Sequence, residues 1–86
     1  MVQVKLSAGL LRYFPRQESE IEAGNLRDLL RRMDEIQTGF SARVLDERNR
    51  LRHDINVFIN GRLIIDKDRL DYSFPPGSTI HFQGEG

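Results

Sequence analysis

One amphipathic helix is the feature of this sequence that most restricts the fold. It begins after Asn25, a favourable N-cap residue, and Asp28 supplies a carboxylate three positions later. Gly39 predicts a left-handed stop after the helix. Because an apolar stripe of this kind is stable only when buried, the rest of the chain has to cover it. The stripe consists of Leu26, Leu29, Leu30, Met33 and Ile36.

The apolar residues outside this helix mostly alternate with polar ones, as they do in strands with one buried face. Asn60-Gly61 lies between two such runs and predicts a hairpin with a type I′ turn, which requires positive φ at both central residues. Short helical pieces are predicted at residues 7–14 and 40–45, and residues 66–74 have no regular pattern. The predicted strands are residues 2–6, 18–23, 55–59, 62–65 and 79–82.

This order of elements predicts an α+β fold of the β-grasp type. In that fold a small mixed sheet of about five strands packs on one main helix, and the first and last strands are neighbours. A chain of 86 residues has room for one core, so residues 1–82 are predicted to form one domain. Residues 83–86 are small or polar, and we expect them to form a flexible tail.

The composition argues against several classes of function. Thirteen Lys and Arg balance thirteen Asp and Glu, whereas a nucleic-acid-binding domain normally has a basic excess. The chain has no cysteine, which excludes disulfides, thiolate zinc sites and cysteine nucleophiles. No apolar run is long enough to span a membrane, and the N-terminus does not have the pattern of a signal peptide. We therefore expect a cytoplasmic protein with no nucleic-acid or membrane partner.

The polar residues give little support for catalysis. His53 and His81 are predicted to be exposed, and no spacing of histidines or carboxylates predicts a metal site. No glycine pattern predicts a phosphate or dinucleotide site, so no cofactor is expected. Residues 48–53 form a basic cluster flanked by Asp46, Glu47 and Asp54. The cluster is interpreted as a solvated loop, with the steering of an acidic partner as the alternative.

Four segments together resemble the MoaD/ThiS family, which comprises the small subunit of molybdopterin synthase and the sulfur carrier of thiamine biosynthesis. They are residues 4–12, 25–30, 55–61 and 76–78, in the family's order and at suitable separations. The resemblance implies a ubiquitin-like fold and a C-terminal glycine, here Gly86, that an E1-like enzyme adenylates and that becomes a thiocarboxylate. The sulfur then passes to a synthase subunit, so the chain would be a carrier and not itself an enzyme.

The tail departs from the family pattern, because Gly84-Glu85-Gly86 replaces the usual ending in two glycines. The resemblance assigns Gly84 and Glu85 to threading through a narrow channel, where a side chain adds bulk. The Glu85 carboxylate would repel ATP phosphates by about 1 kcal/mol in bulk water at about 4 Å, or about 4 kcal/mol at an effective dielectric of about 20. Activation would then be impaired unless the activating enzyme supplies a cation.

The altered tail leaves two other functions open. One is an interaction module with an inert tail, and the other is an accessory subunit whose tail completes a partner's active site. Phe58 points away from the side of Val57 and Ile59, and with Leu63 it is a candidate partner surface. Packing of Phe58 beneath residues 66–74 is the favoured interpretation, because a domain of this size has few large apolar groups to spare.

Overall fold

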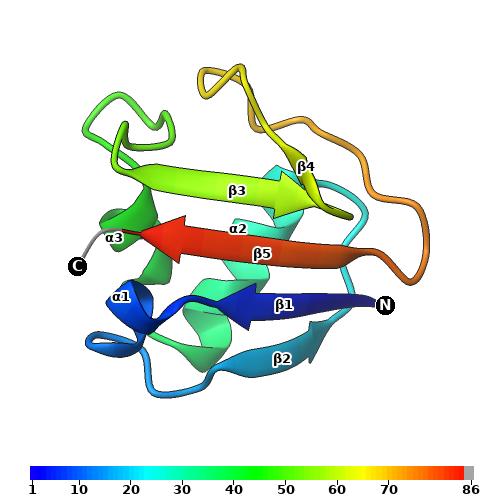
Figure 1. Ribbon diagram of the computed structural model, residues 1–86, viewed down its shortest axis with the longest axis horizontal. Helices are drawn as coiled ribbons and strands as arrows, with labels where there is room; N and C mark the ends of the chain where they lie inside the picture. Colours follow the sequence, from blue (N-terminus) through cyan, green and yellow to red (C-terminus); the bar gives the residue numbers. More distant parts are fainter. Residues whose placement is uncertain (85–86) are drawn as a thin grey trace.

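The computed structural model describes residues 1–84 and shows one five-stranded mixed sheet with the helices behind one of its faces (Figure 1). The strands are β1 (Val2–Leu6), β2 (Glu18–Ile21), β3 (Ile55–Ile59), β4 (Arg62–Leu63) and β5 (Thr79–Gly84). The helices are α1 (Ala8–Leu11), α2 (Leu26–Ile36) and α3 (Phe40–Val44). Within residues 1–84, no helix has the length and apolarity that crossing a membrane requires.

The first and last strands pair in parallel at the centre of the sheet, whose strand order is β2-β1-β5-β3-β4. Val4 lies opposite Ile80, and Leu6 lies opposite Phe82. The other three strand pairs are antiparallel. The two ends of the sequence therefore form the middle of the sheet, as the predicted β-grasp requires.

Phe40 of α3 occupies the centre of the core between the helices and the sheet. Its ring meets the edge of the Phe82 ring at 5.1 Å between centroids, and it lies 5.0 Å from the Phe14 ring. Phe40 and Phe82 are both fully buried. Tilted and edge-on arrangements of this kind are the favourable ones for aromatic pairs. The core therefore joins the loop after α1, helix α3 and the central strand β5.

The predicted α2 stripe is buried except at its last member. Leu26, Leu29, Leu30 and Met33 are buried, but Ile36 is 42% exposed. Ile36 is the final residue of α2 and lines a surface groove with Tyr13 and Pro15. The prediction that Ile36 belongs to the core is wrong. The apolar spacing continues to the last residue of α2, but the residues that bury the rest of the helix do not extend that far.

Several predicted boundaries also differ from the structure. Strand β4 ends at Leu63 and not at residue 65, and helix α1 covers Ala8–Leu11 and not residues 7–14. Strand β2 ends at Ile21, two residues before the predicted end at residue 23. Gly39 has the expected left-handed φ of 86°, but it precedes α3 and does not directly follow α2, which ends at Ile36. Strand β5 continues to Gly84, two residues beyond its predicted end at residue 82.

The hairpin and the following loop are fixed by backbone geometry. Asn60 and Gly61 have φ values of 51° and 83°, which confirms the positive φ predicted at both turn positions. The loop then crosses the start of α2, where the Leu26 amide donates to the Tyr72 carbonyl at 2.9 Å and the Arg27 amide donates to the Leu70 carbonyl at 2.8 Å. These bonds supply partners for amides that a helix start leaves unpaired.

Replacing Asn25 by alanine tests the predicted helix cap. The Asn25 Oδ1 atom accepts a hydrogen bond from the Asp28 amide at 2.8 Å, and alanine removes that acceptor. We expect Asn25→Ala to lower the free energy of unfolding by about 1 kcal/mol in urea denaturation. Asn25→Ser keeps an acceptor and should stay near the wild-type value. An equal loss in both variants would contradict a role for the side chain as a cap.

Candidate functional site

Gly84 is held at the end of β5 by a hydrogen bond to Ser7 and by its place opposite β3. Its amide donates to the Ser7 Oγ atom at 3.1 Å, and it lies opposite Ile55 in the β3–β5 pair. The Ser7 amide in turn donates to the Phe82 carbonyl at 3.0 Å. Ser7 is the N-cap residue of α1, so the helix start and the strand end are fixed to each other.

Gly84 is also the position in β5 where a side chain would not fit without movement. A Cβ atom there would lie 2.9 Å from Ile55 Cδ1 and 3.2 Å from both Cγ and Cδ2 of Leu10. Leu10 and Ile55 are buried, so both side chains have little room to move. Gly84 therefore has a structural role in the sheet. The predicted role in threading through a partner's channel stays a prediction.

Glu85 and Gly86 lie outside the described residues, so their predicted roles also stay predictions. The position from which this segment starts is defined, because β5 ends beside α1 and between β1 and β3 (Figure 1). Any partner that binds residues after Gly84 therefore approaches this end of the sheet.

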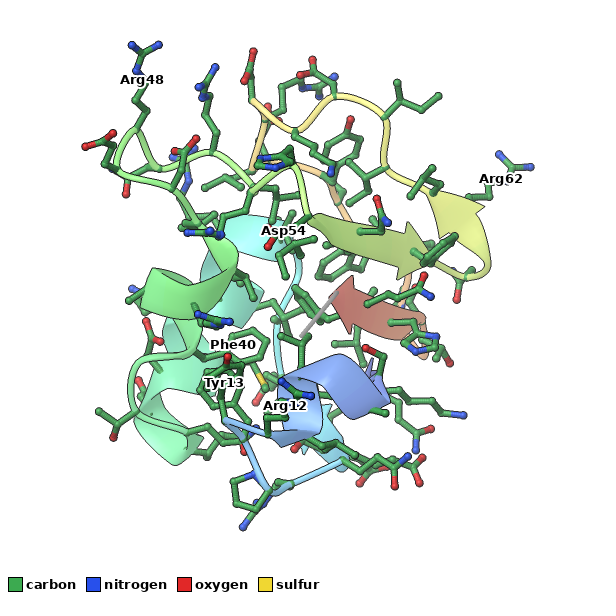
Figure 2. The ribbon with its side chains drawn as sticks, turned by 60° about the vertical axis from the view of Figure 1, so that its left-hand side comes forward. Arg12, Tyr13, Phe40, Arg48, Asp54 and Arg62 are labelled. Atoms are coloured by element: carbon green, nitrogen blue, oxygen red, sulfur yellow. The ribbon has the colours of Figure 1, made fainter. Side chains whose placement is uncertain are left out.

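Cationic and aromatic groups lie on the surface near this strand end. Figure 2 shows Arg12 and Tyr13 together in front of the buried Phe40 ring. The Arg43 guanidinium lies 3.8 Å from the centre of the Tyr13 ring, and Tyr13 is 47% exposed. Tyrosine and arginine contribute strongly to binding at protein interfaces. A surface cluster of this composition suits contact with acidic groups.

The outer face of the sheet carries one row of side chains across all five strands. The register places Leu63, Phe58, His81, Lys5 and Glu18 side by side in that order. The row changes from apolar at β4 and β3 to charged at β1 and β2, where Lys5 Nζ lies 3.9 Å from Glu18 Oε1. Directly opposed side chains on neighbouring strands contact each other, so the row forms a continuous surface.

Phe58 and Leu63, the predicted partner surface, are brought together on this face. Phe58 lies between Leu63 and His81, with ring centroids of Phe58 and His81 6.3 Å apart. Phe58 is partly buried, but it is not among the residues that form or pack against the core. The favoured prediction of packing in the core is therefore wrong, because Phe58 lies beside Leu63 and outside the core. The role of these two residues as a partner surface stays a prediction.

Sequence reasoning missed Ile65, which extends this apolar surface beyond β4. Ile65 is 88% exposed and Leu63 is 47% exposed, while Ile64 between them is buried. Both exposed residues line a groove with Tyr72 and Pro75. The signal was present in the run Leu63-Ile64-Ile65, because alternation allows only one face of such a run to be buried.

The described residues offer no group of side chains suited to holding a metal ion. Residues 1–84 contain no cluster of three or more His, Asp or Glu side chains that could hold a metal ion. His53 and His81 are exposed, as predicted. The hydrogen bond from Arg69 lowers the pKa of the Asp71 carboxyl, which makes this exposed group a poor proton donor near neutral pH.

No protein-family model and no curated protein matches the sequence. Among solved structures, a chain of the BexX/CysO complex of Amycolatopsis orientalis superposes with a TM-score of 0.86 at 18% identity, covering 100% of this chain and 97% of that chain. CysO of Mycobacterium tuberculosis gives 0.86 at 15% identity, covering 100% of both chains. SAMP1 of Haloferax volcanii gives 0.76 at 18% identity, covering 99% and 94%.

The chain has the β-grasp fold of CysO and SAMP1. The fold implied by the MoaD/ThiS resemblance is thereby confirmed, including the central pairing of the first and last strands. The similarity covers the described part of β5 and its end at Gly84.

Replacing Gly84 by alanine tests the close packing at the strand end. We expect Gly84→Ala to lower the free energy of unfolding by about 1–3 kcal/mol, because the added methyl group would overlap Ile55 and Leu10. Gly24→Ala is the matched control, since a Cβ atom there meets no other atom within 4 Å and the φ angle is not positive. Urea denaturation of both variants measures the difference. Equal stability would show that Leu10 and Ile55 adjust at little cost.

Proposed function

We propose that this protein is a ubiquitin-like sulfur carrier that transports sulfur as a thiocarboxylate on Gly86. The observation that carries the proposal is the β-grasp sheet whose last strand, β5, reaches Gly84 at one end of the domain and is held there by Ser7. The resemblance to the MoaD/ThiS family and the fold shared with CysO and SAMP1 support it. A carrier of this type needs no cysteine, which fits the composition.

The proposed chemistry takes place on partner enzymes. An E1-like enzyme lets the Gly86 carboxylate displace pyrophosphate from ATP, which gives an acyl adenylate. A sulfide equivalent then displaces AMP and leaves the thiocarboxylate, which donates its sulfur to a synthase subunit in molybdopterin, thiamine or related biosynthesis. The apolar half of the outer sheet face, with Phe58 and Leu63, is proposed to contact these partners. The CysO fold in complex with BexX is a precedent for a partner bound to such a domain.

Intact-mass measurement tests the chemistry directly. We expect incubation with ATP, a sulfur donor and the E1-like enzyme of the same host to exchange one oxygen for sulfur. Fragmentation of the C-terminal peptide should place the exchange at Gly86. Glu85→Gly should be activated faster, by up to about a thousandfold if the full charge repulsion applies. A carboxylate that stays unmodified in both proteins would overturn the carrier function.

A non-activated interaction module is the second candidate. It is favoured by the exposed apolar side chains of Leu63 and Ile65, which line one groove with Tyr72 and Pro75, because adjoining exposed apolar groups are typical of interaction sites. In this alternative the sheet surface is the whole functional site and the residues after Gly84 take no part.

Two variants distinguish the candidates. In an assay of sulfur transfer or partner-dependent activity, the carrier proposal predicts that deletion of Gly86 abolishes function. Phe58→Ala should only weaken it, because the aromatic contact contributes to binding and not to the chemistry. The interaction-module function predicts the reverse, with the larger loss in Phe58→Ala and the smaller one on deletion of Gly86. Circular dichroism of both variants controls for loss of the fold.

A further inference from the structure

The turn between β3 and β4 contains a pair of residues that is prone to a spontaneous chemical reaction. In an Asn-Gly pair, the glycine nitrogen can attack the side-chain carbon of the asparagine, because glycine has no Cβ atom to block the approach. Asn60-Gly61 is the one such pair in the sequence, whereas Asn25, Asn49 and Asn56 are followed by larger residues. Asn60 and Gly61 are both exposed, so the reactive pair is in contact with water.

Hydrogen bonds fasten the Asn60 side chain to the start of β5. Its Oδ1 atom accepts from the Thr79 amide at 2.9 Å, and its Nδ2 atom donates to the Ser78 hydroxyl at 3.2 Å. The backbone amide of Asn60 also donates to the Thr79 carbonyl at 2.9 Å. Both polar atoms of the side chain are thus occupied, and any movement of Asn60 has to break these bonds.

The backbone of the turn keeps the two reacting atoms apart. The φ values of Asn60 and Gly61, 51° and 83°, are those of a type I′ turn, in which ψ of the first residue is about 30°. At this angle the Gly61 nitrogen lies on the opposite side of the Cα–C bond from the Asn60 Cβ atom. The reaction closes a five-membered ring and needs both atoms on the same side. The turn therefore has to open before the reaction takes place.

We propose that Asn60 is a deamidation site whose reaction is controlled by local opening of the β3–β4 turn. In the open turn the Gly61 nitrogen loses its proton and bonds to the Asn60 side-chain carbon, and Nδ2 leaves that carbon as ammonia. Water then opens the cyclic imide at either of its two carbonyl carbons. One product is aspartate, and the other is isoaspartate, in which the main chain runs through the former side chain. The net change replaces ammonia by water, with no change of oxidation state.

Both products alter the hairpin beside the apolar part of the outer sheet face. Aspartate keeps an acceptor for the Thr79 amide but loses the donor to Ser78, a buried residue whose hydroxyl already donates to the Pro75 carbonyl at 2.6 Å. Isoaspartate adds one carbon to the main chain of a two-residue turn, which shifts Leu63 relative to Phe58, the residue opposite it. The modification therefore acts on the sheet surface and is independent of the chemistry proposed for the C-terminal glycine.

Peptide mapping by mass spectrometry tests the proposal. The full-length protein is incubated at mildly alkaline pH, both folded and unfolded in urea, and aspartate and isoaspartate are quantified at each asparagine over time. We expect Asn60 to convert at least about tenfold more slowly in the folded protein, because only the open turn reacts. Asn49 is the internal control, since it is exposed with a φ of 60° but precedes Arg50. In the unfolded chain it should convert more slowly than Asn60.

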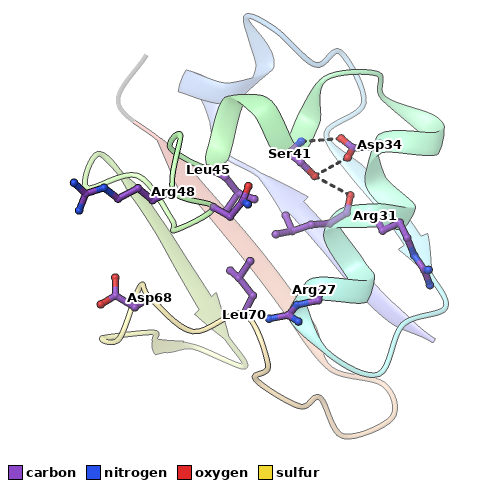
Figure 3. A pocket seen from close by; sticks show the side chains of 10 residues that line it. Arg27, Arg31, Asp34, Ser41, Leu45, Arg48, Asp68 and Leu70 are labelled. Atoms are coloured by element: carbon purple, nitrogen blue, oxygen red, sulfur yellow. Dashed lines mark hydrogen bonds between the residues drawn. The ribbon is translucent and has the colours of Figure 1, made fainter.

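Two serine variants distinguish local opening of the turn from unfolding of the whole domain. Ser78→Ala removes the acceptor for Nδ2 and should speed the conversion of Asn60 in the folded protein by about two- to tenfold, the effect of one lost hydrogen bond. Ser41→Ala is the matched control, because the Ser41 hydroxyl donates to Asp34 at 2.6 Å and joins α3 to α2 (Figure 3). It should lower the free energy of unfolding without changing the rate at Asn60.

The dependence of the wild-type rate on urea gives a second measurement, which holds even where Ser78→Ala does not fold. Local opening exposes little surface, so the rate at Asn60 should change little below the unfolding transition. A rate that rises with the full urea dependence of global unfolding would overturn the proposal. Equal rates in folded and unfolded protein, or equal acceleration by Ser78→Ala and Ser41→Ala, would overturn it as well.

Discussion

The parallel pairing of β1 with β5 is the interaction on which the rest of the structure depends. It joins the first and last strands of the domain and places Val4 and Ile80 in the same buried layer. Helix α2 and Phe40 of α3 pack against this layer, so the core forms around the pairing. The same pairing brings Ser7 to Gly84 and thereby fixes where the chain leaves the sheet. Core packing and the geometry of the proposed carrier site therefore have a common origin.

The two faces of the domain are organised by different forces. The inner face is a close-packed apolar layer, and its residues follow directly from alternation along the strands. The outer face is a graded row from apolar Leu63 to charged Glu18. The side chains of the outer face do not have to be buried in the core, so the residues at these positions can be suited to binding a partner.

Sequence patterns predicted which helices and strands form better than they predicted where each one ends or what it packs against. The α2 cap at Asn25 and the turn at Asn60-Gly61 were predictable because each depends on local backbone chemistry. The exposure of Ile36 and the strand position of Gly84 depend on residues distant in sequence, which periodicity does not report. Phe58 is the clearest case, since alternation gave its direction but not what lies on that side of the sheet. Ile65, in contrast, was predictable, because alternation allows only one face of the run Leu63-Ile64-Ile65 to be buried.

The hydrogen bond between Ser7 and Gly84 also determines when, during folding, the end of β5 reaches its final position. It joins residues separated by 77 positions, so closing it requires nearly the whole chain to be in place. A partially folded chain has no defined strand end, and its final residues then start from no fixed position. A partner that recognises the sheet and the following residues together thus selects native molecules over misfolded ones.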